Sequence, residues 1–406
     1  MSKLDIVIDE RQGAVWATAV DEQRRLFAIE CDTPGEEIRW GSIFLGKIET
    51  IDKKLDACWV NLGNGLMGLM PRKEWPDPNK DPNAGELLIL QAKTGVTSSE
   101  VPAEELDLMR KVKVEPKVTR LSTDITLPGR YLIYAVKESE NRLSKRIRDH
   151  KLRRQMLHMM EDLKDLNGCI LRASAESIQT DILKREGLLL QEQWEALQER
   201  VEGHEQPQEL MRGPNAIERI LSDMACCTVE RIEVAILEHL TKAESWCERF
   251  APDLVTKIEP VQIENAAEDF ALFHHYDLEE QIEDLLQPYV LLPDGGNIIL
   301  QETAALLAVD VNRGGDQRNS NLELNRIAAK EIGRQLRLRN LGGIVIVDFL
   351  KSKSKVDEGM IIAALEDSVS ADACTVQMHG LTALGLMELT RQRRLPTLRD
   401  RIRGVK

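Results

Sequence analysis

Two stretches of the sequence place an aspartate at the end of an apolar run: LLAVDVN, residues 306–312, and GGIVIVDFL, residues 342–350. Each run is long enough to form a buried strand. A helical pattern separates them, so the region predicts a strand, a helix and a second strand. In a sheet with helical connections, sites are built where the strands end at their carboxyl edge. We therefore expect Asp310 and Asp348 to lie close together.

The helix between these strands is predicted over residues 322–338, and both its period and its ends support it. Ser320 precedes it as a capping residue, and Gly342 and Gly343 follow it. Its apolar residues recur at a spacing of four, as on the buried face of a helix: Leu324, Ala328, Ile332 and Leu336.

The two aspartates are candidate metal ligands. A carboxylate that leaves water needs a partner, and neither has a basic neighbour in the sequence. Mg²⁺ typically takes one or two carboxylates together with waters and phosphate oxygens, and Mn²⁺ suits the same oxygen ligands. Asn312 follows Asp310 by two residues and shares its strand face, so it could add a carbonyl oxygen. A second interpretation, in which both aspartates only cap a turn or a helix, stays open on this pattern.

The composition limits the class of protein. The 406 residues allow two to four domains, and 68 Asp and Glu against 54 Lys and Arg give a net charge of −14. Such an acidic total argues against a broad nucleic-acid-binding surface. The charge is uneven, however, because residues 310–406 hold 17 Lys and Arg against 12 Asp and Glu. Binding to a nucleic acid would therefore be localised and salt-sensitive.

Other classes are excluded more firmly. No apolar stretch is long enough for a membrane helix, and the charged, strand-like N-terminus lacks a signal-peptide core. The seven cysteines form no CxxC pair, which is typical of reduced thiols. We therefore expect a cytoplasmic protein without a disulfide framework or a structural zinc site.

The predicted secondary structure changes along the rest of the chain. Residues 41–130 are rich in short strands interrupted by glycines, as in a small barrel. Residues 131–250 become helical with strands between the helices, and residues 204–214 form a plausible boundary because of their prolines and glycines.

Three phrases in the C-terminal part carry a specific resemblance: VDVNRGGD, NSNLELNRIAAKEIGRQLRLRNLGGIVIVDFL and GLTALGLMELTRQR. In this order and spacing, residues 292–398 resemble the catalytic region of the ribonuclease E/G family. The resemblance implies a subdomain similar to deoxyribonuclease I, with Asp310 and Asp348 as ligands of a catalytic Mg²⁺ and Asn312 as their companion. Mn²⁺ is the alternative metal.

The resemblance extends upstream. GSIFLGKIETIDKKLDACWVNLGNGLMGLMP resembles the family's S1-type OB fold, and KVTRLSTDITLPGRYLIY resembles its exit into a 5′-end sensor domain. The implied fold class is α+β and multidomain. It comprises a split RNase H-like domain (1–40 plus 205–280), an inserted S1-type OB-fold barrel (41–125), a 5′-sensor-like domain (126–204) and an α/β DNase I-like catalytic subdomain (281–406).

The resemblance also implies RNA contacts. Phe44 and Trp59 lie on predicted barrel strands, where aromatic rings stack on bases, although Trp59 could equally belong to the barrel core. Lys117 matches a family lysine that touches RNA, and the basic residues Lys145 and Arg146 could contact phosphate. The basic run 391–394 could do so too, or be solvated charge.

A further implied site is for the 5′ end of the RNA. Arg172 matches the arginine that binds a 5′-monophosphate, a task suited to a guanidinium. The family's neighbouring threonine is Ala173 here, so we expect weaker 5′-end sensing. A surface arginine without a ligand is the other interpretation.

These features favour a Mg²⁺-dependent endoribonuclease that cleaves single-stranded RNA and leaves a 5′-monophosphate. A catalytically impaired RNA-binding or regulatory protein of the same fold is the alternative, and an OB-fold factor bound to ribosomes is a third. The segment after Asn312 is shorter than is usual in the family, which affects substrate positioning. The sequence ends before a CxxC zinc link, so a zinc-linked tetramer is not expected, whereas a monomer and a homodimer both stay open.

Overall fold

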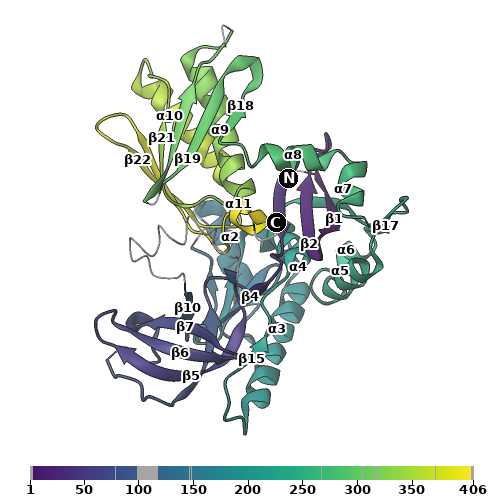
Figure 1. The fold of residues 1–406 in the computed structure, drawn as a ribbon, viewed down its shortest axis with the longest axis vertical. Helices are drawn as coiled ribbons and strands as arrows, with labels where there is room; N and C mark the ends of the chain where they lie inside the picture. The colour runs from purple at the N-terminus through teal and green to yellow at the C-terminus, as the bar shows by residue number, and fades with distance from the viewer. Residues whose placement is uncertain are drawn as a thin grey trace.

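Four larger sheets and the helices around them give the described chain a mixed α+β architecture (Figure 1). The computed structural model describes residues 3–77, 79–97, 118–145, 147, 149–266, 268–303, 305–315, 318–370 and 372–403. This confirms the predicted mixed α+β class. The RNase H-like, S1-type, 5′-sensor and DNase I-like names for its parts, and their boundaries, stay predictions.

The N-terminal sheet joins strands from distant parts of the sequence. Strands β1 (Lys3–Arg11), β2 (Ala14–Val20) and β3 (Leu26–Cys31) pair as consecutive antiparallel neighbours. Strands β16 (Thr228–Val234) and β17 (Ile258–Pro260) add to the other side of β1, both in parallel. Apolar residues are buried on both faces of this sheet, as a layer between helices requires.

Helices cover both faces of the N-terminal sheet. One apolar core contains residues of α4 (Ala216–Asp223), α5 (Leu237–Phe250) and α6 (Pro252–Val255). The core on the other face contains residues of α7 (Ala271–His275) and α8 (Leu278–Asp284), and also Leu338 and Leu398 from the C-terminal part. The C-terminal part is thereby packed against the N-terminal sheet.

A closed five-stranded barrel follows, as the glycine-interrupted pattern predicts. The strands run in the order β5 (Ile43–Asp52), β6 (Ala57–Gly63), β7 (Leu66–Pro71), β10 (Thr119–Ser122) and β8 (Leu87–Ala92), and β8 pairs with β5 to close the ring. The barrel lies at the lower end of the molecule in Figure 1. Outside it, β4 (Glu36–Ile38) pairs with β9 (Val96–Thr97).

A sixth strand, β15 (Gln208–Met211), joins the barrel sheet at β5. It falls within residues 204–214, where the sequence predicted a boundary between domains. Gly63 shows how closely this segment approaches, because its φ is +90° and a Cβ there would lie 2.5 Å from the Pro207 carbonyl oxygen. The segment therefore belongs to the barrel sheet and is not a free linker.

A four-stranded sheet with two helices packs beside the barrel. Its apolar core includes Ile43 and Leu45 of the barrel strand β5, so the barrel and the four-stranded sheet share this core. The strands, in sheet order, are β11 (Thr126–Pro128), β12 (Leu132–Ala135), β14 (Cys169–Leu171) and β13 (Arg142–Leu143), and the helices are α2 (His150–Glu161) and α3 (Thr180–Val201).

The C-terminal part is a six-stranded sheet with helices on one face, at the upper end of Figure 1. The helices are α9 (Asn321–Leu338), which confirms the predicted helix, and α10 (Lys355–Ser370). The last described element is α11 (Leu398–Arg403). The strands, in sheet order, are β18 (Tyr289–Leu291), β19 (Asn297–Glu302), β20 (Leu306–Asn312), β21 (Gly343–Asp348), β23 (Met387–Arg391) and β22 (Val376–Leu381).

Short 3₁₀ turns link several of these elements, at Arg72–Glu74, Ala173–Ala175, Met224–Cys226 and Pro293–Gly295. Across the described ranges, every helix is too short or too polar to span a membrane.

Candidate functional site

Asp310 and Asp348 lie side by side at the carboxyl ends of two parallel strands. Strands β20 and β21 pair in register, and Asp310 is the partner of Asp348. Both side chains are exposed, whereas Val309 and Val347, one residue earlier, are buried against the helices. The strand alternation therefore directs both carboxylates to the open face of the sheet. This confirms that the two aspartates are neighbours.

Asn312 completes this cluster. Its side-chain Nδ2 donates a hydrogen bond of 2.8 Å to Oδ2 of Asp310. Asn312 and Asp310 are two residues apart on β20 and so share the open face. The side-chain amide of Asn312 thereby contacts the Asp310 carboxylate directly.

The first turn of α9 fixes the loops that follow both strands. After β20, Arg313 donates to the Asn319 carbonyl oxygen at 2.8 Å and to Oδ1 of Asn321 at 2.5 Å. After β21, buried Asn325 donates to the Leu350 carbonyl oxygen at 2.7 Å and accepts from the Leu350 N–H at 3.0 Å. The N-terminal part of α9 therefore holds the segments that follow both aspartates.

The short segment after Asn312 is tightly placed where the structure describes it. Gly314 has a φ of +54°, and a Cβ there would lie 2.4 Å from the Gly295 carbonyl oxygen. Gly315 donates its N–H to the same oxygen at 3.1 Å. Asp316 and Gln317 lie outside the described residues. This segment is thus held against the turn Pro293–Gly295.

The donor set fits a hard divalent cation. Two carboxylates and an amide oxygen are oxygen ligands, and their exposure leaves room for waters and a substrate oxygen. Among the described residues, no group of three or more His, Cys, Asp and Glu could hold a metal ion. That finding disfavours an all-protein cage but is compatible with Mg²⁺, which keeps several waters. Helix α9 is capped by Ser320, which accepts from the Glu323 N–H, and not by Asp310.

The prediction that Phe44 stacks on RNA bases is wrong. Its side chain is 1% exposed and lies in the barrel core with Val60 and Leu90. The neighbouring residues Ile43 and Leu45 are buried as well, in the core shared with the four-stranded sheet. A ring enclosed in this way has no face free for a base.

Trp59 lies on the other side of the barrel wall. Its neighbours on β6, Cys58 and Val60, are fully buried, whereas Trp59 is half-buried, so the alternation directs it outward. Leu69 on β7 is its cross-strand partner, and Arg120 on β10 is the next partner in the row. This outer row joins an aromatic ring, an apolar residue and an exposed cation.

Arg120 is a candidate that the sequence analysis missed, because only the pairing of β7 with β10 brings it beside Leu69. Of the other predicted RNA contacts, Lys145 is exposed in a turn. Lys117 and Arg146 lie outside the described residues.

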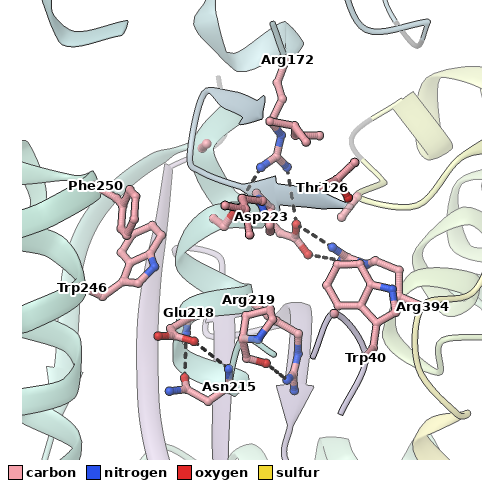
Figure 2. Close-up of a pocket in the computed structure, with 18 of the residues that line it drawn as sticks. Trp40, Thr126, Arg172, Asn215, Glu218, Arg219, Asp223, Trp246, Phe250 and Arg394 are labelled. Carbon is pink, nitrogen blue, oxygen red and sulfur yellow. Dashed lines mark hydrogen bonds and ion pairs between the residues drawn. The ribbon is translucent and has the colours of Figure 1, made fainter. Parts of the chain in front are cut away.

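Arg172 lines a large cavity between the four-stranded sheet, the barrel, helices α4 and α5, and the C-terminal part (Figure 2). The cavity has a volume of about 810 Å³. Arg172 follows β14, and its Nη1 donates to the Gly129 carbonyl oxygen at 3.1 Å and to Oγ of Ser222 at 2.9 Å. Ser174, on the same wall, donates to the Arg130 carbonyl oxygen at 3.3 Å. Arg172 is thus held at the cavity wall by protein acceptors.

Two arginines of the basic run 391–394 form ion pairs inside the protein, whereas Arg393 is exposed. Arg391 is 3% exposed and forms a bidentate pair with Asp372, at 2.8 and 3.0 Å. Arg394 forms an ion pair with Asp223 at the cavity wall. The interpretation of these two arginines as surface charge is therefore wrong.

Glu186 of α3 holds the turn that carries Gly129. Its carboxylate is 3% exposed and accepts the Tyr131 N–H at 3.0 Å. A residue with a side chain does not fit at position 129, because its Cβ would lie 1.9 Å from Oε1 of Glu186. Burial raises the pKa of Glu186 from 4.5 to about 7, against the opposing effect of the main-chain hydrogen bonds.

This raised pKa predicts that Glu186 weakens the fold as pH increases. In the unfolded chain the carboxyl loses its proton near pH 4.5, whereas the folded chain keeps it until about pH 7. The folded state therefore binds more protons in this interval, and stability falls by up to about 3 kcal/mol. Urea unfolding should show this loss between pH 4.5 and 8 for the wild type relative to Glu186→Gln. Glu192→Gln, at an exposed position on the same helix, is the matched control, and parallel pH profiles of wild type and Glu186→Gln would contradict the prediction.

The comparisons with known proteins define the class of this protein. The model of the "Ribonuclease E/G family" matches residues 126–394, more than half of the chain. The chain belongs to this family, which confirms the resemblance seen in the sequence.

Curated relatives match most of this chain. It is 31% identical over 363 residues to ribonuclease E of Nostoc sp., covering 87% of this chain and 51% of the relative. It is 28% identical over 406 residues to ribonuclease E of Haemophilus influenzae, covering 97% and 42%. It is 29% identical over 363 residues to ribonuclease G of Escherichia coli K12, covering 87% and 72%. The chain thus spans about half the length of the ribonuclease E relatives.

Proposed function

We propose that this protein is a Mg²⁺-dependent endoribonuclease that cleaves single-stranded RNA and leaves a 5′-monophosphate on the downstream product. The observation that carries the proposal is the register of β20 and β21, which brings Asp310 beside Asp348 at the exposed carboxyl ends of two central strands. Membership of the ribonuclease E/G family supports the choice of RNA as the substrate.

The residues of the site have distinct roles in this proposal. Asp310 and Asp348 would hold the cation, and the amide of Asn312 orients the Asp310 carboxylate through their hydrogen bond. A bound Mg²⁺ supplies Lewis-acid polarisation of the scissile phosphate and a water nucleophile at neutral pH. Arg313 and Asn325 keep both strand ends in place through α9, which reduces the reorganisation needed when the substrate arrives.

RNA binding is assigned to the outer row of the barrel. Trp59 offers a ring for stacking, and Arg120 lies in the same row for a backbone phosphate. The net charge of −14 confines favourable phosphate contacts to such local surfaces. Binding is therefore expected to weaken steeply with salt.

Removal of the metal tests the proposal directly. An AU-rich single-stranded oligonucleotide should be cleaved internally in Mg²⁺, left intact in excess EDTA, and cleaved again when Mg²⁺ or Mn²⁺ is restored. The downstream product should be a substrate for a 5′-monophosphate-dependent exonuclease, and a fully paired duplex should resist. Cleavage that continues unchanged in EDTA would overturn the metal assignment.

The alternative, a catalytically impaired RNA-binding protein of the same fold, has a different signature. The outer row containing Trp59 and Arg120 does not depend on the metal site, so binding can exist without cleavage. Salt-sensitive binding of the oligonucleotide together with no cleavage in either metal would favour this alternative.

A further inference from the structure

Two consecutive cysteines, Cys226 and Cys227, place their thiols side by side where the turn Met224–Cys226 ends. Their Sγ atoms are 3.8 Å apart, within hydrogen-bonding distance for sulfur. Cys226 also lines the large cavity of about 810 Å³. Both residues are half-buried, whereas the other five cysteines are buried: Cys31, Cys58, Cys169, Cys247 and Cys374. The two thiols therefore adjoin each other, and a small reagent can reach Cys226 from the cavity.

The surroundings of Cys226 favour its thiolate form. The hydrogen bond with Cys227 lowers the pKa of Cys226 to about 7, against the effect of burial, and the charge of Arg172 adds to the lowering. The same hydrogen bond, together with burial, raises the pKa of Cys227, so this thiol keeps its proton. Burial raises the pKa of four other cysteines to about 11 or 12: Cys31, Cys58, Cys169 and Cys247. Cys226 is thus the nucleophile of the pair at neutral pH.

We propose that Cys226 and Cys227 form a site of reversible oxidation, at which a peroxide converts the two thiols into a disulfide between adjacent residues. An oxidant-sensitive site needs a thiolate within reach of solvent and a second thiol beside it, and this turn supplies both. The inference is independent of the proposed endoribonuclease function, because it depends on the two sulfur atoms and not on the metal site.

The reaction takes place in two steps. The Cys226 thiolate attacks one oxygen of hydrogen peroxide, the O–O bond breaks and hydroxide leaves, which gives a sulfenic acid on Cys226. The Cys227 thiol then attacks the Cys226 sulfur, the S–O bond breaks, and the thiol proton leaves with the hydroxide as water. The two sulfurs together lose two electrons, which the peroxide accepts.

A disulfide between adjacent residues is expected to be easily reduced. Consecutive Cα atoms are about 3.8 Å apart. The usual Cα separation across a disulfide is roughly 4.4–6.8 Å, so closing this ring strains the turn. Strained disulfides have more oxidising potentials and react readily with small thiols. Reduced glutathione should therefore return the site to two thiols, as a reversible modification requires.

The oxidised turn lies at a junction of the fold. It connects α4 to β16, whose first residue, Thr228, pairs with Lys3 of β1. The Cys227 N–H donates to the Met224 carbonyl oxygen at 2.9 Å. Ala225 packs against the core of the four-stranded sheet, and Cys227 packs against a core of the N-terminal sheet. Strain in this turn should therefore disturb both cores and lower the melting temperature by a few degrees.

Peptide mapping of the wild type tests the site. Trypsin leaves both cysteines on one peptide, residues 220–231, which contains no other cysteine. The folded protein is treated briefly with a small excess of hydrogen peroxide, and free thiols are then blocked with N-ethylmaleimide in denaturant. This peptide should lose two hydrogens and carry no maleimide, whereas the five buried cysteines should carry the label. Reduced glutathione, added before the blocking step, should restore two maleimide groups.

Substitutions separate the roles of the two thiols. Cys227→Ser should stop the reaction at a sulfenic acid on Cys226, which dimedone labels, and Cys226→Ser should leave the Cys227 thiol largely unreacted. Iodoacetamide at pH 7 should label wild-type Cys226 at least about fivefold faster than Cys227. Cys247→Ala is the matched control, because Cys247 lies in the core against which Cys227 packs. This control should oxidise like the wild type.

The results can overturn the inference without any variant. Maleimide on both sulfurs of peptide 220–231 after peroxide, equal oxidation of the buried cysteines, or a disulfide between separate chains on a non-reducing gel would each do so. The wild-type mapping stays decisive if a substituted chain fails to fold. A melting temperature that does not change on oxidation would overturn the expected effect on the junction, whereas a fall that glutathione reverses would support it.

Discussion

Replacing Asp348 with asparagine is expected to lower the rate of RNA cleavage by about 10²- to 10³-fold, because a transition-state charge loses its stabilising partner. Asparagine keeps the size of the side chain and its position opposite Asp310, but it removes one of two adjacent carboxylates. RNA affinity should change little, since Trp59 and Arg120 lie on the barrel and not on this sheet. Single-turnover cleavage at saturating protein separates the two effects.

The matched variants sharpen this expectation. Asp310→Asn should match the loss seen for Asp348→Asn, and the double variant should add little, because the two carboxylates act as a unit. Asp367→Asn, an exposed change on α10, should leave cleavage unaffected. Equal cleavage by wild type and Asp348→Asn would show that another site performs the reaction.

Removing the carboxylate of Asp372 is expected to destabilise the fold by about 3–5 kcal/mol, because it leaves a buried guanidinium unpaired. The Asp372 side chain is fully buried, and Arg391 is almost so. Asp372 also accepts the Cys374 N–H at 2.8 Å, and Arg391 reaches the Leu341 carbonyl oxygen at 2.9 Å. The pair therefore joins the end of β23 to the segments before β22 and β21.

Urea unfolding of Asp372→Ala at neutral pH measures this cost. The double variant Asp372→Ala/Arg391→Met removes both charges and should recover part of the lost free energy, because no buried charge is then left alone. A single variant within about 1 kcal/mol of the wild type would show that water or a shifted side chain already solvates Arg391.

The sequence predicted the carboxylate pair because the required information is local. The apolar run before each of Asp310 and Asp348 indicates a buried strand that ends at the aspartate. The capped helix between the two runs favours a parallel pairing of these strands, and the register confirms that pairing. Their role as metal ligands stays a prediction. The family resemblance was confirmed as well, since its motifs lie in the same contiguous region.

Other features depend on contacts that no local pattern encodes. Phe44 was misassigned because residues 43–46 are buried on both sides of β5, so the usual alternation of apolar and polar residues is absent. Asp223 is 51 residues from Arg172 in the sequence and 171 from Arg394. Neither ion pair could therefore be predicted from the spacing of residues along the chain. Arg120 likewise joins the outer row only because β10 pairs with β7.

The pairing of β1 with β16 has a consequence for how this protein is made. Lys3 pairs with Thr228, so the partner of the first strand is synthesised about 225 residues later. At typical rates of synthesis this delay lasts roughly 10–45 s. During that time the hairpins of β1–β3 present an open strand edge, which is prone to pair with other chains. This topology therefore exposes the chain to aggregation during synthesis more than after folding is complete. Chaperone binding should matter most at that stage.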